Sequence, residues 1–376
     1  MKWYHFRIKL HNYTVVKVPM MQNALTDLLG IEHPIIQAPM ASAATPEMVI
    51  AASEAGALGS LGAAYMSPDE IRSSIHQIRR ATIRPFQVNL FSPPEPRKLS
   101  DSDVGRAMEP LRAIRQELDL TEPNEVPQFK DQFLAQLKVL LEENISIIGF
   151  HFGLPETEEV EQVKASGALL IGCATRPSDA VILEQSGADI IVAQGFEAGG
   201  HQGTFIAAEE PSTIGLMSLI PQIVDAVSVP VIAAGGLMDG RGLAAALALG
   251  AGAGQLGTAF LATQESKAHD LHKKLLLERK GGVPRFTRAF SGRPARGIVN
   301  RMMEDIEKTP NAILPFPYQH ILTSEIRAVA AKTNKPEFLS MWAGQGANMV
   351  RNMSTGEMVR VLAKELEIAS GIQRVV

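Results

Sequence analysis

The chain has little of several residue types, and each shortage excludes a class of protein. Cysteine occurs once in 376 residues, as Cys173, so no disulfide can form within the chain. A single unpaired thiol suits a reducing compartment, and we expect a cytoplasmic location. Aromatic residues make up only 5% of the chain, whereas 31 residues are glycine, which favours tightly packed α/β layers over a β-sandwich.

Charge and long apolar stretches are also scarce. The net charge of −4 comes without a long basic block, so neither nucleic acid nor an anionic membrane is expected as a partner. No apolar run approaches the length of a membrane-spanning helix. The sequence has no cluster of metal ligands, and we expect no metal. Residues 1–24 lack the long apolar stretch and the cleavage site of a signal peptide and are interpreted as an appended arm.

What the sequence does contain is a regular alternation of short apolar runs and helical patterns. The runs are apolar on both faces, as buried parallel strands are. They occupy residues 34–40, 57–63, 85–91, 145–152, 168–174, 188–195, 230–236 and 252–260. Eight such strands with helices between them predict a closed (β/α)8 TIM barrel of the α/β class. A doubly wound open sheet is the competing architecture, and it is disfavoured because no run has the polar character of an edge strand.

This pattern divides the chain into parts. The predicted barrel covers residues 25–261 and carries a long insertion at about 92–144, which is proline-rich at first and then helical. Residues 262–376 do not continue the alternation. We expect them to form a mostly helical C-terminal region that packs on the barrel and caps part of its mouth, with an amphipathic helix at 355–370.

The active site of a (β/α)8 barrel lies at the C-terminal ends of its strands. The residues expected there are Ala38, Pro39, Met40, Asn89, His151, Gln194, Gly199, Gly200, His201, Gly235, Gly236, Gln255, Leu256, Gly257 and Thr258. The glycines after the seventh and eighth strands suit a phosphate, because they expose main-chain N–H groups and a following helix N-terminus adds a favourable dipole. The segment 252–257 also matches the dinucleotide pattern G-x-G-x-x-G, but its glycines enter and occupy a strand, so we take the match as accidental.

Two histidines stand out among these residues. His201 follows two glycines and is the candidate catalytic base, because an imidazole can take up a proton near neutral pH. Glu197, four residues earlier, either orients this imidazole or is a solvated loop carboxylate. His151 either lines the substrate pocket or packs in the core.

Other rim residues suit a flavin. The carboxamides of Asn89 and Gln194 can donate and accept hydrogen bonds at once, as the polar edge of a flavin ring requires, although each also suits hydrogen bonding to the main chain. Met40 would give the ring an apolar contact. Cys173 lies late in an apolar run and is expected to be a buried core residue rather than a nucleophile.

Several longer motifs resemble those of one enzyme family. They are "PIIQAPMASAATPEMVIAASEAGALGSLGA", "FHFGLP", "QGFEAGGHQG", "VPVIAAGGLMDGRGLAAALALGAGAGQLGTAF", "FSGRPARGIVNR" and "EFLSMWAGQG". Together they are similar to the nitronate monooxygenases, formerly called 2-nitropropane dioxygenases, from about Leu25 to the end of the chain. The sequence departs from the family pattern at "MASAAT", where members more often have an extra glycine, and in its N-terminal arm.

The resemblance implies an FMN-dependent barrel that oxidises alkyl nitronates, such as propionate 3-nitronate, with O2 to a carbonyl compound and nitrite through a flavosemiquinone. It implies a catalytic role for His201 and a substrate-pocket role for His151. It also implies that FMN is bound by Ala38, Pro39, Met40, Asn89, Gln194, Gly199, Gly200, Gly235, Gly236, Gln255, Leu256, Gly257 and Thr258. A homodimer is compatible with the sequence, which fixes no oligomeric state. The alternatives are an FMN-dependent enoyl-acyl-carrier-protein reductase II, an NADH:quinone reductase, and a non-catalytic protein that binds a flavin or phosphate ligand.

Overall fold

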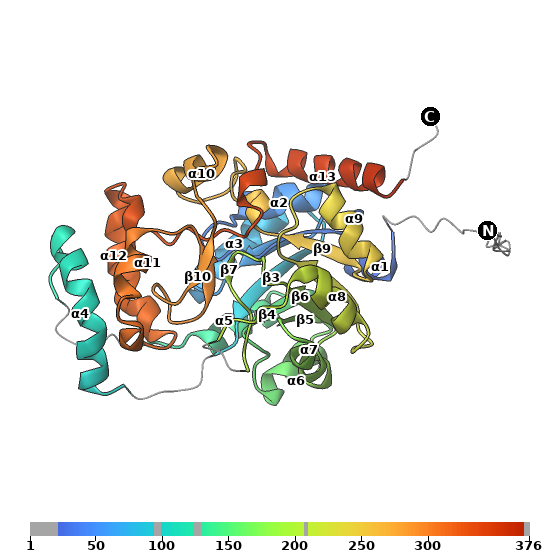
Figure 1. Cartoon of the computed structure of the whole chain (residues 1–376). Helices are drawn as coiled ribbons and strands as arrows, with labels where there is room; N and C mark the ends of the chain where they lie inside the picture. Colours follow the sequence, from blue (N-terminus) through green and yellow to red (C-terminus); the bar gives the residue numbers. More distant parts are fainter. Residues whose placement is uncertain (1–21, 94–98, 123–128, 207–209, 372–376) are drawn as a thin grey trace, which may run out of the picture.

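The fold is an eight-stranded parallel barrel with a helical addition at one end (Figure 1). The computed structural model describes residues 22–93, 99–122, 129–206 and 210–371. The predicted arm at 1–24 therefore lies almost wholly outside the described residues. The barrel strands are β1 (Ile35–Gln37), β2 (Gly59–Gly62), β3 (Phe86–Phe91), β4 (Ile147–His151), β5 (Leu169–Ala174), β6 (Ile190–Gln194), β8 (Val231–Ala234) and β9 (Ala253–Leu256).

The order of the strands confirms the predicted TIM barrel. Neighbours pair in parallel in the order β1-β9-β8-β6-β5-β4-β3-β2. A parallel bridge between Ile36 and Leu58 joins the two ends of this order and closes the sheet. All eight strands fall within the apolar runs that predicted them, and the accidental dinucleotide motif lies in and beside β9, as expected.

The α-helices of the described chain fall into two groups. Those that surround or close the barrel are α1 (Ala24–Leu29), α2 (Pro46–Glu54), α3 (Pro68–Ala81), α5 (Phe133–Glu142), α6 (Thr157–Ala165), α7 (Pro177–Gln185), α8 (Leu216–Val224), α9 (Gly240–Ala248) and α13 (Thr355–Ala369). The others are α4 (Asp101–Glu117), α10 (Asp270–Leu277), α11 (Arg301–Ile306) and α12 (Tyr318–Lys332). Short 3-10 helices lie at Thr258–Phe260, Pro310–Ala312, Pro336–Phe338 and Ala347–Met349.

Local sequence explains where the barrel helices begin. The Thr45 side chain accepts a hydrogen bond from the main-chain N–H of Met48, and a proline follows it at the first helical position of α2. At α3, Ser67 and Glu70 form a capping box around the first turn. These two ends were predicted from the same residues, and both are confirmed.

The barrel interior is filled by side chains from alternate strand positions, including Ile36, Ile147 and Ile232. Helix α1 closes the end of the barrel opposite the helical addition, because Leu25 and Leu29 join this interior cluster. The Asn23 side chain fixes α1 by donating to the main-chain oxygen of Gly252, directly before β9. With this end closed, the opposite end is the one that remains for a ligand.

The helical addition, called the cap below, consists of α4 and the elements between β9 and α13. It has a hydrophobic core of its own, which includes Met108, Leu111, Phe290, Met302 and Ile326. Helices α4, α11 and α12 stand side by side on one flank of the barrel (Figure 1). Helix α4 was not predicted, and it joins the cap although it comes from the insertion. Helix α13, which was predicted, packs on α9 and α2 along the outer ring rather than over the mouth.

A small antiparallel sheet connects the cap with the barrel mouth. It consists of β10 (Arg285–Thr287), β11 (Ala295–Gly297) and β7 (Gly200–His201), in the order β10-β11-β7. This sheet was not predicted, because its strands are only two or three residues long. The sheet matters for the site, since it includes His201.

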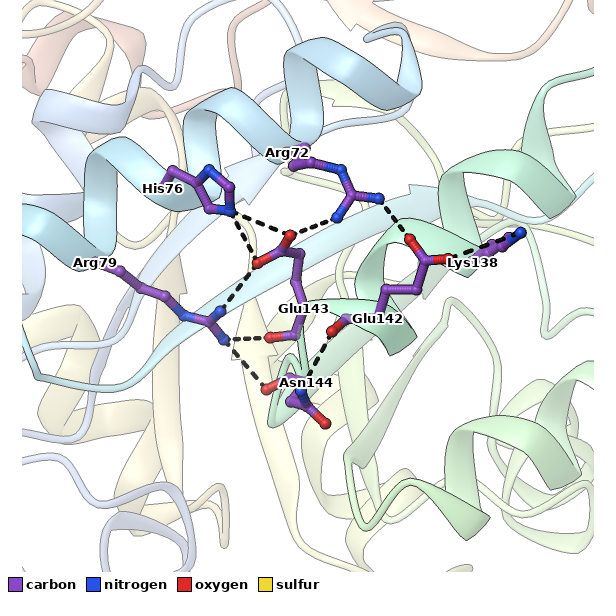
Figure 2. Close-up of polar contacts among 7 residues, drawn as sticks. All are labelled: Arg72, His76, Arg79, Lys138, Glu142, Glu143 and Asn144. Atoms are coloured by element: carbon purple, nitrogen blue, oxygen red, sulfur yellow. Dashed lines mark hydrogen bonds and ion pairs between the residues drawn. The ribbon is translucent and has the colours of Figure 1, made fainter.

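An ion-pair cluster holds two barrel helices together. Figure 2 shows the Glu143 carboxylate, just after α5, in contact with Arg72, His76 and Arg79 of α3. Arg79 also donates to the main-chain oxygens of Glu143 and Asn144, so it covers the C-terminal end of α5. The cluster therefore ties the helix that follows β2 to the helix that precedes β4.

We expect Glu143→Gln to lower the free energy of unfolding by about 1 kcal/mol. This value is at the upper end of the range for exposed ion pairs, because one carboxylate contacts several cations. Denaturant unfolding of the variant and the parent would measure this difference, and 1 M salt should reduce it. Glu161→Gln, at an exposed position of α6 beyond its first turn, is the matched control and should change stability little. Equal stability of all three proteins would contradict a structural role for the cluster.

Candidate active site

A cavity of about 450 Å³ lies at the barrel mouth, between the carboxyl ends of the strands and the cap. It is the size of a small-molecule or cofactor site. Of the residues predicted from the sequence, the cavity brings together Ala38, Pro39, Met40, Asn89, His151, Gln194, Gly199, Gly200, His201, Gly235, Gly236, Gln255, Gly257 and Thr258. Leu256 is the exception, because its side chain is buried in the core between the barrel and its helices.

The main chain at His201 is held from three sides. On the side away from the barrel, His201 pairs with Ala295 of β11. Its carbonyl oxygen accepts a hydrogen bond from Gln194 Nε2 at 3.0 Å and another from His151 Nε2 at 3.2 Å. Gly200 before it adopts a φ of +73°, a conformation that favours glycine. The imidazole is thus fixed by its backbone at the cavity wall.

The carboxamide of Gln194 hydrogen-bonds to the main chain, which is one of the two uses considered for it from the sequence. Besides donating to His201, it accepts a hydrogen bond through Oε1 from the main-chain N–H of Gly203 at 2.7 Å. Cys173, which is buried as predicted, also points its thiol at this oxygen, and burial raises the pKa of the thiol to about 12. The main task of Gln194 in the structure is to position the loop that carries His201.

The His201 side chain has a partner that the sequence did not reveal. Its Nε2 lies 2.8 Å from Ser291 Oγ, a residue of the cap in the "FSGRPAR" motif. The rings of Phe91, Phe152 and Trp342 surround the imidazole at centroid distances of 6.0, 5.8 and 5.5 Å. The ring is therefore oriented by one hydroxyl and otherwise packed among aromatic side chains.

Glu197 does not orient the imidazole, so that alternative of the sequence interpretation is wrong. Both of its carboxylate oxygens accept from the main-chain N–H of Leu216, at 3.0 and 2.9 Å. Leu216 is the first residue of α8, so Glu197 caps that helix, where the dipole favours a negative charge. Nor is it a freely solvated loop carboxylate.

Burial keeps the histidines of the site neutral. It lowers the pKa of His201 well below 6.5, and the nearby His151, His320, Arg293 and Arg327 lower it further. Burial likewise lowers the pKa of His151 to about 4, against the opposing hydrogen bond to the His201 oxygen. Near neutral pH His201 is consequently an uncharged imidazole that can accept a proton.

We expect acid to destabilise the protein between pH 6.5 and pH 4. Burial lowers the pKa of His151 and His272 to about 4 and that of His320 to about 3, whereas an unfolded histidine titrates near 6.5. The unfolded chain then binds more protons than the folded one, so stability falls as the pH falls through this window. At pH 5 the loss is about 2 kcal/mol for each of these histidines. Denaturant unfolding at pH 7 and pH 5 measures it, and a flat profile would contradict the burial of neutral imidazoles.

We expect Ser291→Ala to reduce kcat/KM by about two- to tenfold, the range that corresponds to one net hydrogen bond. The imidazole would lose its only side-chain hydrogen bond among the described residues. Steady-state kinetics of the parent and the variant with one substrate would measure the loss. A Ser291→Thr variant keeps the hydroxyl and should recover part of it, while equal rates for parent and Ser291→Ala would show that the contact is not needed.

The second feature of the cavity is a cradle of main-chain N–H groups after β8 and β9. These two strands are neighbours in the barrel, so their glycine corners lie together. Among the described residues, the N–H groups of Gly236, Gly257 and Thr258 donate to no protein acceptor. Gly235 and Gly236 adopt φ of +120° and +68°, which glycine alone adopts readily. Unpaired N–H groups that converge on a cavity suit an anion such as a phosphate.

One part of the phosphate argument needs correction. The N-terminus of α9 was expected to add its dipole, but the Asp239 side chain already accepts from the N–H groups of Arg241 and Gly242. Glu365 of α13 accepts from the N–H of Gly240. Protein carboxylates thus occupy this helix end, and the cradle depends on the glycine corners alone.

The segment 342–346 of the "WAGQG" motif closes the cradle from the cap side. The N–H of Gly344 donates to Thr258 Oγ1 at 2.9 Å, which leaves the hydroxyl hydrogen available for a ligand. A Cβ on Gly199 would lie 2.4 Å from the nitrogen of Gly344, so these two chains approach as closely as glycine permits. Asn89 also lines the cavity, and its carboxamide makes no hydrogen bond within the described chain.

Sequence reasoning missed the residues that the cap contributes. Ser291, His320, Arg327 and Trp342 all lie beyond the last barrel strand, where no β/α alternation indicates which side chains face the mouth. Two of them are in motifs that the family resemblance had marked, Ser291 in "FSGRPAR" and Trp342 in "WAGQG". That resemblance was the one signal that could have found them.

Two kinds of feature are absent from the described residues. No group of three or more His, Cys, Asp or Glu side chains is placed to hold a metal ion there. Within the same part of the chain, no helix has the length and apolar character needed to cross a membrane.

Fold and site together define an enzyme of the (β/α)8 barrel class, with its reactive groups at the carboxyl ends of the strands. A family model described as nitronate monooxygenase matches residues 22–365, and the chain belongs to this family. It is therefore an oxidoreductase, and membership of the family implies a flavoprotein.

Individual relatives agree with this assignment. The chain is 40% identical over 352 residues to a probable nitronate monooxygenase of Bacillus subtilis, covering 91% of this chain and 99% of the relative. A probable nitronate monooxygenase of Staphylococcus haemolyticus is also 40% identical, with 92% and 97% coverage. Among solved structures, a nitroalkane oxidase from Streptomyces ansochromogenes has 41% identity and a TM-score of 0.85, with 93% and 99% coverage. FabK from Thermotoga maritima has 30% identity and a TM-score of 0.72, with 93% and 97% coverage.

Proposed function

We propose that the protein binds FMN and oxidises alkyl nitronates with O2 to a carbonyl compound and nitrite. One observation carries this proposal: a neutral imidazole, His201, and an unpaired N–H cradle line the same cavity. The lining has histidine, lysine and arginine side chains but no aspartate or glutamate among the described residues. Such a cavity favours anions, and both a flavin phosphate and a nitronate are anions.

The residues present fit FMN. Gly236, Gly257 and Thr258 would hold the phosphate through their N–H groups, with the Thr258 hydroxyl as a further donor. The free carboxamide of Asn89 would meet the polar edge of the ring, and Met40 would contact its face. When bound, FMN supplies the electron transfer between the nitronate and O2, while the protein determines orientation and protonation.

His201 would act as the base for substrates that arrive as neutral nitroalkanes. Its low pKa keeps the imidazole unprotonated, so it can take the α-proton and produce the nitronate. The protonated imidazole would then face an anion and hydrogen-bond to its nitro oxygens. His151, whose Nε2 is committed to the His201 oxygen, would line the substrate side of the cavity.

A short series of measurements tests the proposal. The purified protein should show a flavin absorption spectrum, and the released cofactor should be FMN by chromatography. Oxygen uptake should follow addition of propionate 3-nitronate but not of NADH. Prompt anaerobic bleaching of the flavin by NADH would instead favour an enoyl-acyl-carrier-protein reductase or an NADH:quinone reductase, and a flavin that neither reagent reduces would indicate a binding protein.

The proposal includes three further expectations from the sequence. These are a cytoplasmic location, a homodimer, and a division of the chain into barrel and C-terminal region near residue 261. Cell fractionation and size-exclusion chromatography with light scattering test the first two. Limited proteolysis that cuts near residue 261 would support the third.

A further inference from the structure

Arg327 on α12 lines the active-site cavity, and it has no acidic partner among the residues that the structure describes. Its Nε is buried and has no hydrogen-bond partner in the described chain. The only hydrogen bonds of the guanidinium there run from Nη2 to His320, at 2.9 Å to the main-chain oxygen and 3.3 Å to Nδ1. A buried donor without an acceptor is costly, so a ligand that supplies one would bind favourably.

The position of the guanidinium is fixed by its neighbours. His320, which accepts from Nη2, stacks on Tyr65 with centroids 4.5 Å apart and ring planes 10° from parallel. Tyr65 follows β2 and also lines the cavity. Arg327 and His201 line the same cavity, so the two side chains face a common space. The charge is thus held in place beside the proposed reaction centre.

Other cations near the site are less suited to a ligand. Arg293 donates through Nη1 to the main-chain oxygen of Thr204 at 2.6 Å, and its guanidinium lies 4.0 Å over the Phe152 ring. It is occupied by these contacts and does not line the cavity. Lys267 does line the cavity, but an ammonium is a point charge, whereas a guanidinium matches a carboxylate with two parallel donors.

We propose that Arg327 selects nitronates that carry a second negative charge, a carboxylate at the end of the chain remote from the nitro group. The inference rests on the proposed function, because it places the reacting carbon near His201 and the tail toward α12. The free edge of the guanidinium would bind the tail carboxylate through two hydrogen bonds. A neutral alkyl tail would leave the buried Nε unsatisfied and bind less well.

The test compares 3-nitropropionate, which carries a carboxylate, with 1-nitrobutane, which does not, each as its nitronate. The measured quantity is the ratio of kcat/KM for the two substrates. We expect Arg327→Met to lower this ratio by about tenfold or more, the scale for losing a charge-assisted hydrogen bond. Arg327→Lys keeps the charge and should retain part of the preference. Lys332→Met, an exposed cation on the same helix, is the matched control and should leave the ratio unchanged.

A binding measurement separates this inference from the proposed function. Anaerobic titration of the holoprotein gives the Kd of 3-nitropropionate and of 1-nitrobutane even if neither is turned over. We expect Arg327→Met to weaken only the former, by about tenfold or more. Equal losses for both ligands, or a loss of preference in Lys267→Met instead, would overturn the assignment. If Arg327→Met does not fold, Arg327→Lys decides. A Lys variant with the parental melting temperature and an unchanged ratio of kcat/KM would overturn the assignment.

Discussion

Replacing His201 by asparagine should lower kcat/KM for a neutral nitroalkane by about 100-fold or more, the usual contribution of a general base. The reason is that asparagine retains a polar side chain of similar reach but cannot take the α-proton at neutral pH. The buried imidazole is uncharged and stands at the cavity wall, so it is the group available for this step. Oxygen uptake with 1-nitropropane near pH 7 measures the effect.

The same variant should behave differently with a preformed nitronate, which has already lost its proton. There we expect a clearly smaller loss, limited to the hydrogen bond that the protonated imidazole would give to the nitro oxygens. Flavin content should match the parent, because the cradle after β8 and β9 is untouched. His76→Asn, on the exposed side of α3, is the control histidine. A His201→Asn variant with parental turnover of neutral nitroalkanes would rule out the base.

Gly257→Asp should abolish FMN binding at ordinary cofactor concentrations. If the phosphate is bound at the Gly257 N–H, a carboxylate on this residue would lie about 5 Å from it. At an effective dielectric constant of about 20 the repulsion would raise the free energy of binding by about 3 kcal/mol per unit charge, which is more than about 100-fold in Kd. The protein should be isolated without its flavin absorption and with a normal circular dichroism spectrum. Titration with FMN then measures the residual affinity.

The geometry at Gly257 makes this variant easy to interpret. Its φ of −103° is open to any residue, unlike the positive φ of Gly236. A Cβ there would meet the Ala38 Cβ at 3.6 Å and Met40 Sδ at 3.8 Å, which are ordinary contacts. Gly257→Ala is therefore the matched control and should retain FMN. Full flavin occupancy in Gly257→Asp would place the phosphate elsewhere.

The sequence could predict the barrel because each of its strands is buried on both faces. Runs such as 85–91 and 188–195 have no other explanation once they recur between helices with clear caps, as at Thr45 and Ser67. Helix α4 escaped prediction because it interrupts the alternation and contains Pro110, which usually ends a helix. Its apolar face finds a partner only in the cap, far along the chain.

The candidate site was predictable to the extent that topology alone determines it. Residues at the carboxyl ends of barrel strands must meet at the mouth. Their position at a strand end was therefore enough to predict that Asn89, His151 and Gly236 line one cavity. What a side chain contacts once it is there depends on tertiary neighbours. Hence the sequence did not show that Glu197 caps a helix or that Gln194 holds a loop. Nor did it show that Ser291, which lies between the short strands β10 and β11, contacts His201.

The pairing of His201 with Ala295 has a consequence for how this enzyme could be divided or recombined. The candidate base belongs to a sheet whose other two strands, β10 and β11, come from the C-terminal region. Ser291, the hydroxyl partner of His201, lies in the same region. A chimera that exchanges only the last hundred or so residues between relatives would keep His201 from one parent and take Ala295 and Ser291, which fix and orient it, from the other. The match between the two parental segments, rather than either segment alone, would therefore decide whether such a recombinant aligns its candidate base.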